Sequence, residues 1–278
     1  MAHLESNRSG SARRFTGRFL TEDSPLHLPG SDAWLVGIIV VVLLGAWEGA
    51  ARAGLISALF FPPPSVIAAS ATALVRDGTL PMNMAVTLER LLFGMLLGGI
   101  PGLLLGQLLG RSPRLRAVIN PFFAAAHPIP KIAILPLIMI IFGIGEAPKV
   151  IVAATGAFFP MLINTMTGVQ QINPIHFEVA QNYGASRWKV FTRVILPGSL
   201  PFMLAGLLLA LNVTLLLTIA VEMVSSQTGL GAMIWLAWET MHVEDLYSAL
   251  AVITLFGIGF NFALQHLRKR LVPWEVAT

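Results

Sequence analysis

Long apolar runs separated by short polar segments constrain this sequence more than any other feature. Only 12% of its 278 residues are charged, whereas soluble domains have roughly a quarter. A run of about 20 apolar residues is long enough to cross a bilayer as a helix, and helices satisfy their own backbone hydrogen bonds there. We therefore predict an all-α membrane protein with six transmembrane helices inside residues 31–272. The predicted spans are about 33–53, 87–109, 117–142, 147–169, 193–224 and 246–267.

The basic residues predict the orientation of these spans. Four proposed inner segments carry 4, 3, 3 and 3 of the 18 Lys and Arg residues, an excess typical of cytoplasmic loops. Both termini are then cytoplasmic. Residues 1–30 are polar and lack a signal-peptide pattern, so we predict a disordered cytoplasmic tail. Because the basic residues lie at the ends of apolar runs and form no continuous stripe, the net charge of +4 does not indicate nucleic-acid binding.

A polar interruption at 173–201 separates two of the long runs. Asn173 followed by Pro174 is typical of a helix start, and Gly184 can adopt the left-handed conformation that ends a helix. This predicts a short helix over 174–184, with Glu178 early enough to favour the positive end of the helix dipole. Ser186 predicts a second helix start, followed by basic residues that mark the cytoplasmic side.

Helical spacing places Phe177, Ala180, Gln181 and Gly184 on one face of the predicted short helix. The small residues Ala180 and Gly184 would let another surface approach closely. An amphipathic connector lying on the membrane is the alternative interpretation.

The segment from Glu178 to Pro197 resembles the signature of permease subunits of ATP-binding-cassette importers. That signature has Glu-Ala-Ala, a Gly four residues after the second Ala, and Ile-x-Leu-Pro ten residues beyond that Gly. The matching residues are Glu178, Ala180, Gly184, Leu196 and Pro197, while Val179 and Val194 depart mildly. The runs HPIPKIAILPL, IFGIGEAPK and GAFFPMLINT resemble the nitrate, sulfonate and taurine branch of these permeases.

The resemblance implies the fold of type I importer permeases, with a cytoplasmic coupling helix at 174–184 that docks on a separate ATPase subunit. It also implies a second permease copy, which we expect to be identical, an extracellular or periplasmic substrate-binding protein, and a bacterial cytoplasmic (inner) membrane. The residues that we assign to ATPase coupling are Glu178, Ala180, Gln181, Gly184, Ala185, Arg187 and Pro197. The implied cargo is a small organic or inorganic anion such as a sulfonate, taurine or nitrate.

Glycines and prolines predict how the spans pack. Gly94, Gly98, Gly102, Gly106 and Gly110 recur every four residues and form one ridge for close helix packing. Pro101 inside that run predicts a kink. The prolines between 121 and 136 free carbonyl groups, so we expect this third region to lie within the bundle and not against lipid.

Polar residues inside the spans are candidates for a substrate pathway: His127, Lys131, Asn164, Thr214, Thr218 and Glu222. His127 and Lys131 would share a face if their helix persists and could attract an anion, or Lys131 could reach an interface or pack. Hydrogen bonding between helices is the alternative for Asn164, and Glu222 could instead lie near a wet outer boundary.

Other classes of protein fit the sequence less well. A secondary transporter is the main alternative, but no convincing repeat or ion-coupling carboxylate pair is present. An intramembrane enzyme would need a motif such as HExxH or GxSxG, and neither occurs. A purely structural scaffold would not need the signature. Without a GxxxxGK[ST] loop, we expect no cofactor on this chain and ATP to be bound by the partner ATPase.

Overall fold

The computed structural model describes residues 33–275, and the predicted tail at 1–30 lies outside them. The chain divides into two units, residues 1–47 and residues 48–278. Helix α1, Ala33–Arg52, contains the boundary between them. Its large apolar side chains from Trp34 to Leu44 are exposed, as lipid-facing residues of a span would be.

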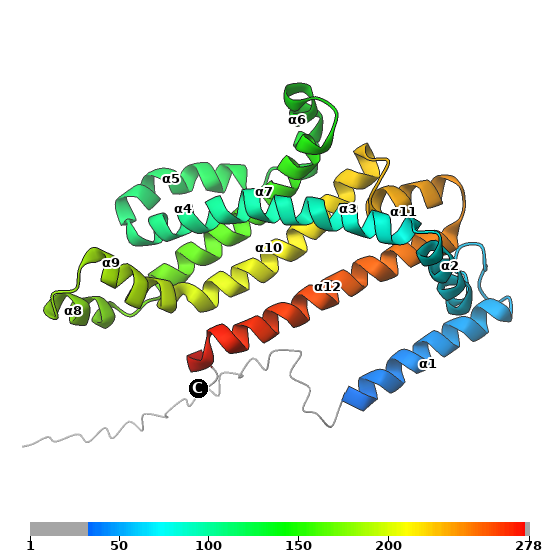
Figure 1. Ribbon diagram of the computed structural model, residues 1–278, viewed down its shortest axis with the longest axis horizontal. Coiled ribbons are helices and arrows are strands. Elements are labelled where there is room, and N and C mark those ends of the chain that lie inside the picture. The colour runs from blue at the N-terminus through cyan, green and yellow to red at the C-terminus, as the bar shows by residue number, and fades with distance from the viewer. Residues whose placement is uncertain (1–32, 276–278) are drawn as a thin grey trace, which may run out of the picture. The chain divides into compact units, whose positions relative to one another are not determined.

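Every regular element in residues 33–275 is a helix (Figure 1). After α1 come α2 (Pro64–Arg76), α3 (Thr79–Gly94), the π-helical η1 (Met95–Gly99), α4 (Ile100–Arg111), α5 (Pro113–Ala126), the 3₁₀ helix η2 (Lys131–Ile134), α6 (Leu135–Phe142), α7 (Glu146–Gln170), α8 (Pro174–Asn182), α9 (Arg187–Val190), the π-helical η3 (Phe191–Ile195), α10 (Leu196–Ser225), α11 (Leu230–Glu239), α12 (Val243–Leu271) and the 3₁₀ helix η4 (Pro273–Glu275).

The described residues include five helices that are long and apolar enough to cross a membrane, or six if the bent pair α5 and η2–α6 is one span. The predicted all-α class is confirmed. The second of these helices is longer than expected, because α3, η1 and α4 run continuously from Thr79 to Arg111.

Helix α7 lies at the centre of the second unit, between α4 on one side and α10 on the other (Figure 1). The glycine ridge makes the first contact possible. A Cβ atom added at Gly106 would lie 2.7 Å from the carbonyl oxygen of Leu162 and 2.8 Å from Cβ of Thr165. Gly94, Gly98, Gly102 and Gly110 face the same helix with equally little room, so the predicted packing ridge is confirmed.

Two π-helical segments each end just before a proline. Segment η1 is followed by Pro101, and η3 is followed by Pro197. A proline cannot donate a backbone hydrogen bond and its ring crowds the preceding turn, so a wider turn there relieves the clash. These are the places where the long helices depart from regular α geometry, and the predicted kink at Pro101 stays a prediction.

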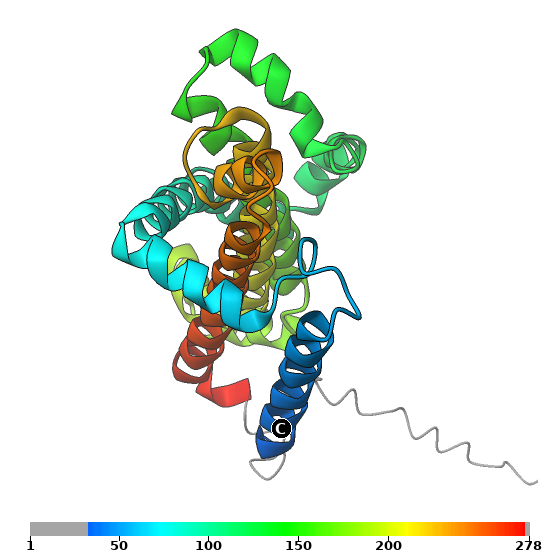
Figure 2. The same ribbon diagram turned by 90° about the vertical axis from the view of Figure 1, so that its right-hand side faces the viewer.

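The expectation that the third region lies within the bundle is wrong for a single chain. The helix stops at Ala126, and α5 and η2–α6 meet at 85° (Figure 2). No side chain of α5 is buried, and Phe122 is 71% exposed, whereas α6 buries Leu135 and Ile138 against α7 and α10. The break at the prolines lets each short helix satisfy its own backbone, so burial of α5 is not required.

Helix α2 begins at Pro64 without a side-chain cap. Ser65, the second residue of the helix, bonds to Glu48: its hydroxyl lies 2.7 Å from one carboxylate oxygen and its amide 3.0 Å from the other. Pro63 occupies the cap position, and Pro64 supplies the first helical residue.

Candidate functional site

Helix α8 begins as the sequence predicted. The side-chain oxygen of Asn173 accepts a hydrogen bond from the amide of Ile175 at 3.0 Å, and Pro174 is the first helical residue. This arrangement satisfies one of the unpaired amides of the first turn and removes another. The helix start is therefore encoded locally and needs little support from the rest of the fold.

The end of α8 is a complete Schellman motif. Gly184 has φ of +65°, its amide donates to the carbonyl of Gln181 at 2.9 Å, and the amide of Ala185 donates to the carbonyl of Ala180 at 2.9 Å. Ser186 then caps α9 by accepting from the amide of Lys189. The predicted roles of Gly184 and Ser186 as helix terminator and helix cap are confirmed.

Phe177 attaches α8 to the rest of the molecule. It packs with Val190 and Phe191 against the buried residues Val169, Ile172 and Ile195. Of the residues that helical spacing groups on one face, Phe177 and Ala180 are half-buried, whereas Gln181 and Gly184 are exposed. An aromatic ring buries far more apolar area than the other side chains of this short helix, so it turns towards the protein.

The exposed side chains of α8 include an apolar stripe, Ile175, Val179 and Tyr183, at spacings of four, of which Val179 also borders a hollow next to α10. Their exposed fractions are 54%, 48% and 88%. Residues four apart lie on one side of a helix, so the spacing of these apolar residues in the sequence is the signal that predicts the stripe. Apolar side chains gathered on a polar, solvent-accessible segment are typical of a surface that meets a partner.

The remaining residues assigned to coupling lie around this stripe. Glu178, Gln181 and Arg187 are exposed, and Ala185 is half-buried. Glu178 is the fifth residue of α8, and the first turn has no acidic residue, so the dipole effect that we expected for Glu178 is small. Its carboxylate is available to another molecule.

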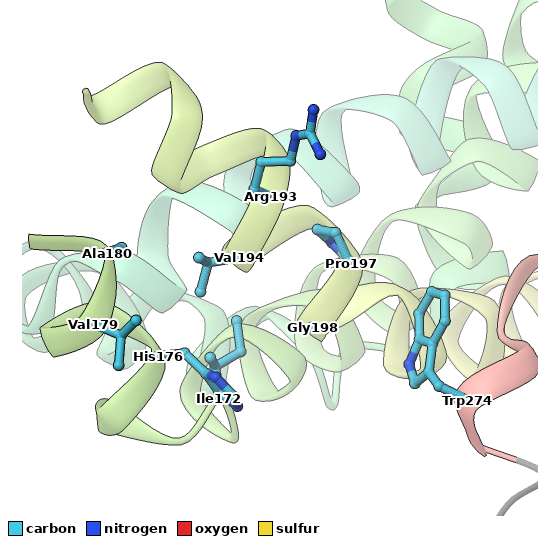
Figure 3. Close-up of a pocket in the computed structure, with 9 residues that line it drawn as sticks. All are labelled: Ile172, His176, Val179, Ala180, Arg193, Val194, Pro197, Gly198 and Trp274. Atoms are coloured by element: carbon cyan, nitrogen blue, oxygen red, sulfur yellow. The ribbon is translucent and has the colours of Figure 1, made fainter. Parts of the chain in front are cut away.

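A hollow of about 380 Å³ separates α8 from the start of α10 (Figure 3). Ala180 and Pro197 both line it. Both residues match the importer-permease signature, although they are separated in the sequence. The other side chains include the basic pair His176 and Arg193 and the ring of Trp274 near the C-terminus. The hollow therefore leaves space between α8 and the start of α10.

The opposite end of α7 carries a charged cluster that the sequence did not reveal as a unit. Arg90 on α3 is 3% exposed and bonds to both oxygens of Glu146 at 2.6 and 2.8 Å, to Glu222 at 2.8 Å and to the carbonyl of Thr228 at 2.7 Å. Lys149 adds a further ion pair to Glu146 at 2.9 Å. Three helices, α3, α7 and α10, are therefore joined through one guanidinium group.

Glu222 is completely buried in this cluster. Besides Arg90, its carboxylate accepts from the hydroxyl of Thr87 and from the amide of Gly231 at 2.9 Å. The expectation that Glu222 is wet or lines a pathway is wrong for this conformation, because protein groups occupy its hydrogen-bonding positions. Gly229, with φ of +107°, lies so close to the carboxylate that a Cβ atom there would collide with it.

Thr214 and Thr218 lie in the packed core between α7 and α10. Both are buried, the hydroxyl of Thr218 donates to the carbonyl of Thr214, and the backbone of Thr214 is close to Gly156. Asn164 donates to the carbonyl of Pro160 at 2.9 Å and packs against Gly206. In this conformation these three positions contribute to the contacts within and between α7 and α10, and their assignment to a substrate pathway stays a prediction.

His127 and Lys131 lie together, although the helix does not persist through them. The ammonium of Lys131 donates to the carbonyl of His127 at 3.2 Å and lies 5.3 Å from the centre of the Phe159 ring. The His127 ring meets Phe159 edge-on at 5.4 Å. His127 is exposed and Lys131 half-buried, so both can reach a solute. Within residues 33–275, no three His, Asp or Glu side chains gather closely enough to hold a metal ion.

Comparisons with known proteins agree with this architecture. Residues 91–275 match the family described as "Binding-protein-dependent transport system inner membrane component". The taurine transport system permease protein TauC of Escherichia coli is 33% identical over 85% of this chain and 88% of its own. A putative aliphatic sulfonates transport permease protein of Bacillus subtilis is 29% identical over 87% and 88%, and a nitrate import permease protein of Leptolyngbya laminosa is 30% identical over 72% and 71%.

Solved structures share the fold. A chain of the MetNI methionine ABC transporter in an inward-facing conformation aligns with a TM-score of 0.62 at 17% identity, over 70% of this chain and 97% of that one. A chain from a crystal structure of an amino acid ABC transporter aligns with a TM-score of 0.60, over 72% and 97%.

Proposed function

This chain belongs to the binding-protein-dependent transport system inner membrane component family and is a permease subunit of an ATP-binding-cassette importer, and from that premise we propose that ATP hydrolysis in a partner subunit moves its helices through α8. One observation carries the proposal. Helix α8 presents an exposed apolar stripe beside Glu178, whose carboxylate forms no ion pair within residues 33–275, and Phe177 packs the helix against the rest of the chain.

This geometry suits the transmission of movement. A partner that closes can change the permease only if its surface binds α8 differently in the open and closed states. The caps at both ends of α8 make it a rigid unit, and the hollow next to α10 gives it room to tilt. Displacement of α8 would act on α9, η3 and the base of α10 through Phe177.

For the cargo we propose a small anion, in the class of sulfonates, taurine or nitrate. The relatives named as taurine, sulfonate and nitrate permeases support this proposal, together with the basic pair His127 and Lys131. Lys131 is held over Phe159 and pairs with no carboxylate in residues 33–275, so its charge is available to an anion.

The partners follow from the same proposal. Two ATPase subunits bind at the α8 end, which faces the cytoplasm of a bacterial inner membrane, with both termini on that side. A substrate-binding protein docks at the Glu146 end. A second, identical copy of this chain completes the pathway, and the unburied side chains of α5 and the exposed Ile140 and Ile141 of α6 are available to it.

A substitution on the stripe tests the coupling role. Val179→Asp places a charge in the docking surface at an exposed helical position, where Val and Asp have similar helix propensity. We expect the purified variant to lose ATPase co-purification and substrate-stimulated ATP hydrolysis while it inserts normally. Val66→Asp on α2, where the valine is 44% exposed, is the matched control and should retain both. Full ATPase binding by Val179→Asp would contradict the proposal.

A further inference from the structure

A second hollow, of about 580 Å³, lies at the α8 end of the molecule on the other side of Phe177. Its volume is in the range of about 300–1,000 Å³ typical of ligand pockets. Arg111 at the end of α4, Arg116 in the first turn of α5 and Gln170 at the end of α7 supply its polar lining. Phe177 of α8 and Val190 of α9 supply part of its apolar lining.

The charge of this hollow is uncompensated. No carboxylate forms an ion pair with Arg111 or Arg116 in the part of the chain that the structure describes. The guanidinium of Arg111 lies 5.3 Å from the centre of the Phe191 ring, a cation–π contact that favours this orientation of the side chain. Two guanidinium groups and an amide facing one space favour an oxyanion, since arginine matches phosphate oxygens through paired hydrogen bonds.

The apolar side chains of this hollow and its position in the fold indicate which kind of oxyanion it binds. Val169, Ile172 and Ile195 line the same hollow, which a free, fully hydrated anion would not need. The basic groups stand where α4 and α7, two membrane-spanning helices, end. Basic pockets between helix ends at this level bind phospholipid headgroups, with the glycerol and upper acyl chain against apolar residues.

We propose that this hollow binds the phosphate group of an anionic phospholipid. Because Phe177 and Val190 form its wall, the bound lipid restrains α8 and α9 and so favours one position of α8 over another. The inference requires that the spans lie in a bilayer, and it goes beyond ATPase coupling. It is tested independently of that role, because lipid binding is measured without nucleotide.

The experiment is native mass spectrometry of the purified full-length protein, titrated with phosphatidylglycerol or with phosphatidylcholine of the same acyl chains. We expect tighter retention of phosphatidylglycerol. Arg116→Gln should weaken that binding about fivefold, the effect of one basic residue near a lipid phosphate. Arg114→Gln is the matched control, because Arg114 is exposed in the same helix start but does not line the hollow.

Three results would overturn the proposal. Equal retention of the two lipids would remove the headgroup specificity. Equal weakening by Arg114→Gln and Arg116→Gln would show diffuse attraction to the surface. If millimolar inorganic phosphate displaced the lipid and stabilised the protein against unfolding as strongly as the lipid does, the site would be assigned to a free oxyanion. If Arg116→Gln does not fold, Arg111→Gln gives the same comparison from another helix.

Discussion

The two ends of helix α7 are held in opposite ways. At the Glu146 end, buried charges join α3, α7 and α10 through Arg90, and Glu222 is fully desolvated. At the α8 end, no side chain of α8 or α9 is buried, and local caps with one aromatic ring hold the segment. The Glu146 end is therefore rigid and intolerant of change, whereas the α8 end can move as a unit and offer its surface to another molecule.

The largest expected effect is at the Glu146 end. Arg90→Met would leave Glu222 buried without its charged partner, and breaking a buried pair in this way costs about 3–5 kcal/mol. We expect a lower midpoint of thermal unfolding in detergent and loss of folded protein from membranes. Arg76→Met, at an exposed arginine in α2, should have no comparable effect. A stable Arg90→Met protein would show that the charged cluster does not hold this end.

The glycine ridge between the two ends should give the next largest effect. Gly106→Ala inserts a methyl group 2.7 Å from the carbonyl oxygen of Leu162, and overpacking of this kind costs about 1–3 kcal/mol. Gly257→Ala in α12, where the added atom meets nothing within 4 Å, is the matched control. Thermal unfolding of both variants checks the difference, and equal stability would contradict the packing role of the ridge.

A smaller effect on stability, with a larger effect on transport, is expected at the α8 end. Gly184→Val forces a branched side chain into a left-handed conformation, at a cost of about 1–2 kcal/mol confined to the end of α8. We expect normal insertion but reduced substrate uptake per ATP hydrolysed in proteoliposomes.

The control for this variant is Gly184→Asn, because asparagine tolerates the left-handed conformation. The added Cβ meets nothing within 4 Å in the isolated chain, so the conformation and not crowding is under test. If Asn and Val reduce coupling equally, a close contact with the partner and not the helix end is responsible.

The smallest expected effect on stability is at Lys131. Its contact with Phe159 is worth about 0.5–1 kcal/mol, so Lys131→Gln should fold normally. If the lysine attracts an anionic cargo, the variant should need a higher substrate concentration for half-maximal uptake, with less change at saturation. Unaltered uptake of an anion at all concentrations would remove Lys131 from the pathway.

The sequence predicted the features that depend on neighbouring residues. The Asn173 and Ser186 caps, the left-handed Gly184 and the ridge from Gly94 to Gly110 follow from local backbone rules and from helical periodicity. The family signature likewise lies within one short segment.

Features that depend on folding across the chain were not predictable. Arg90 and Glu222 are 132 positions apart and nothing local pairs them, so the sequence alone predicts a pathway role for Glu222 and does not predict its burial against Arg90. The sequence also does not show which face of α8 packs against the rest of the protein. Burial of Phe177 depends on the apolar surface offered by Val169, Ile172 and Ile195, which only the folded chain brings together.

The measurement that tests the central account most directly uses the absence of cysteine from the sequence. A single cysteine at Gln181, an exposed position on α8, would be crosslinked in native membranes, and the captured protein identified by mass spectrometry. A cysteine at Ile144, which is 88% exposed at the Glu146 end, is the control. The account predicts capture of an ATP-binding-cassette ATPase from position 181 and not from position 144. Efficient labelling of Gln181→Cys by a soluble thiol reagent without capture of any ATPase would contradict it.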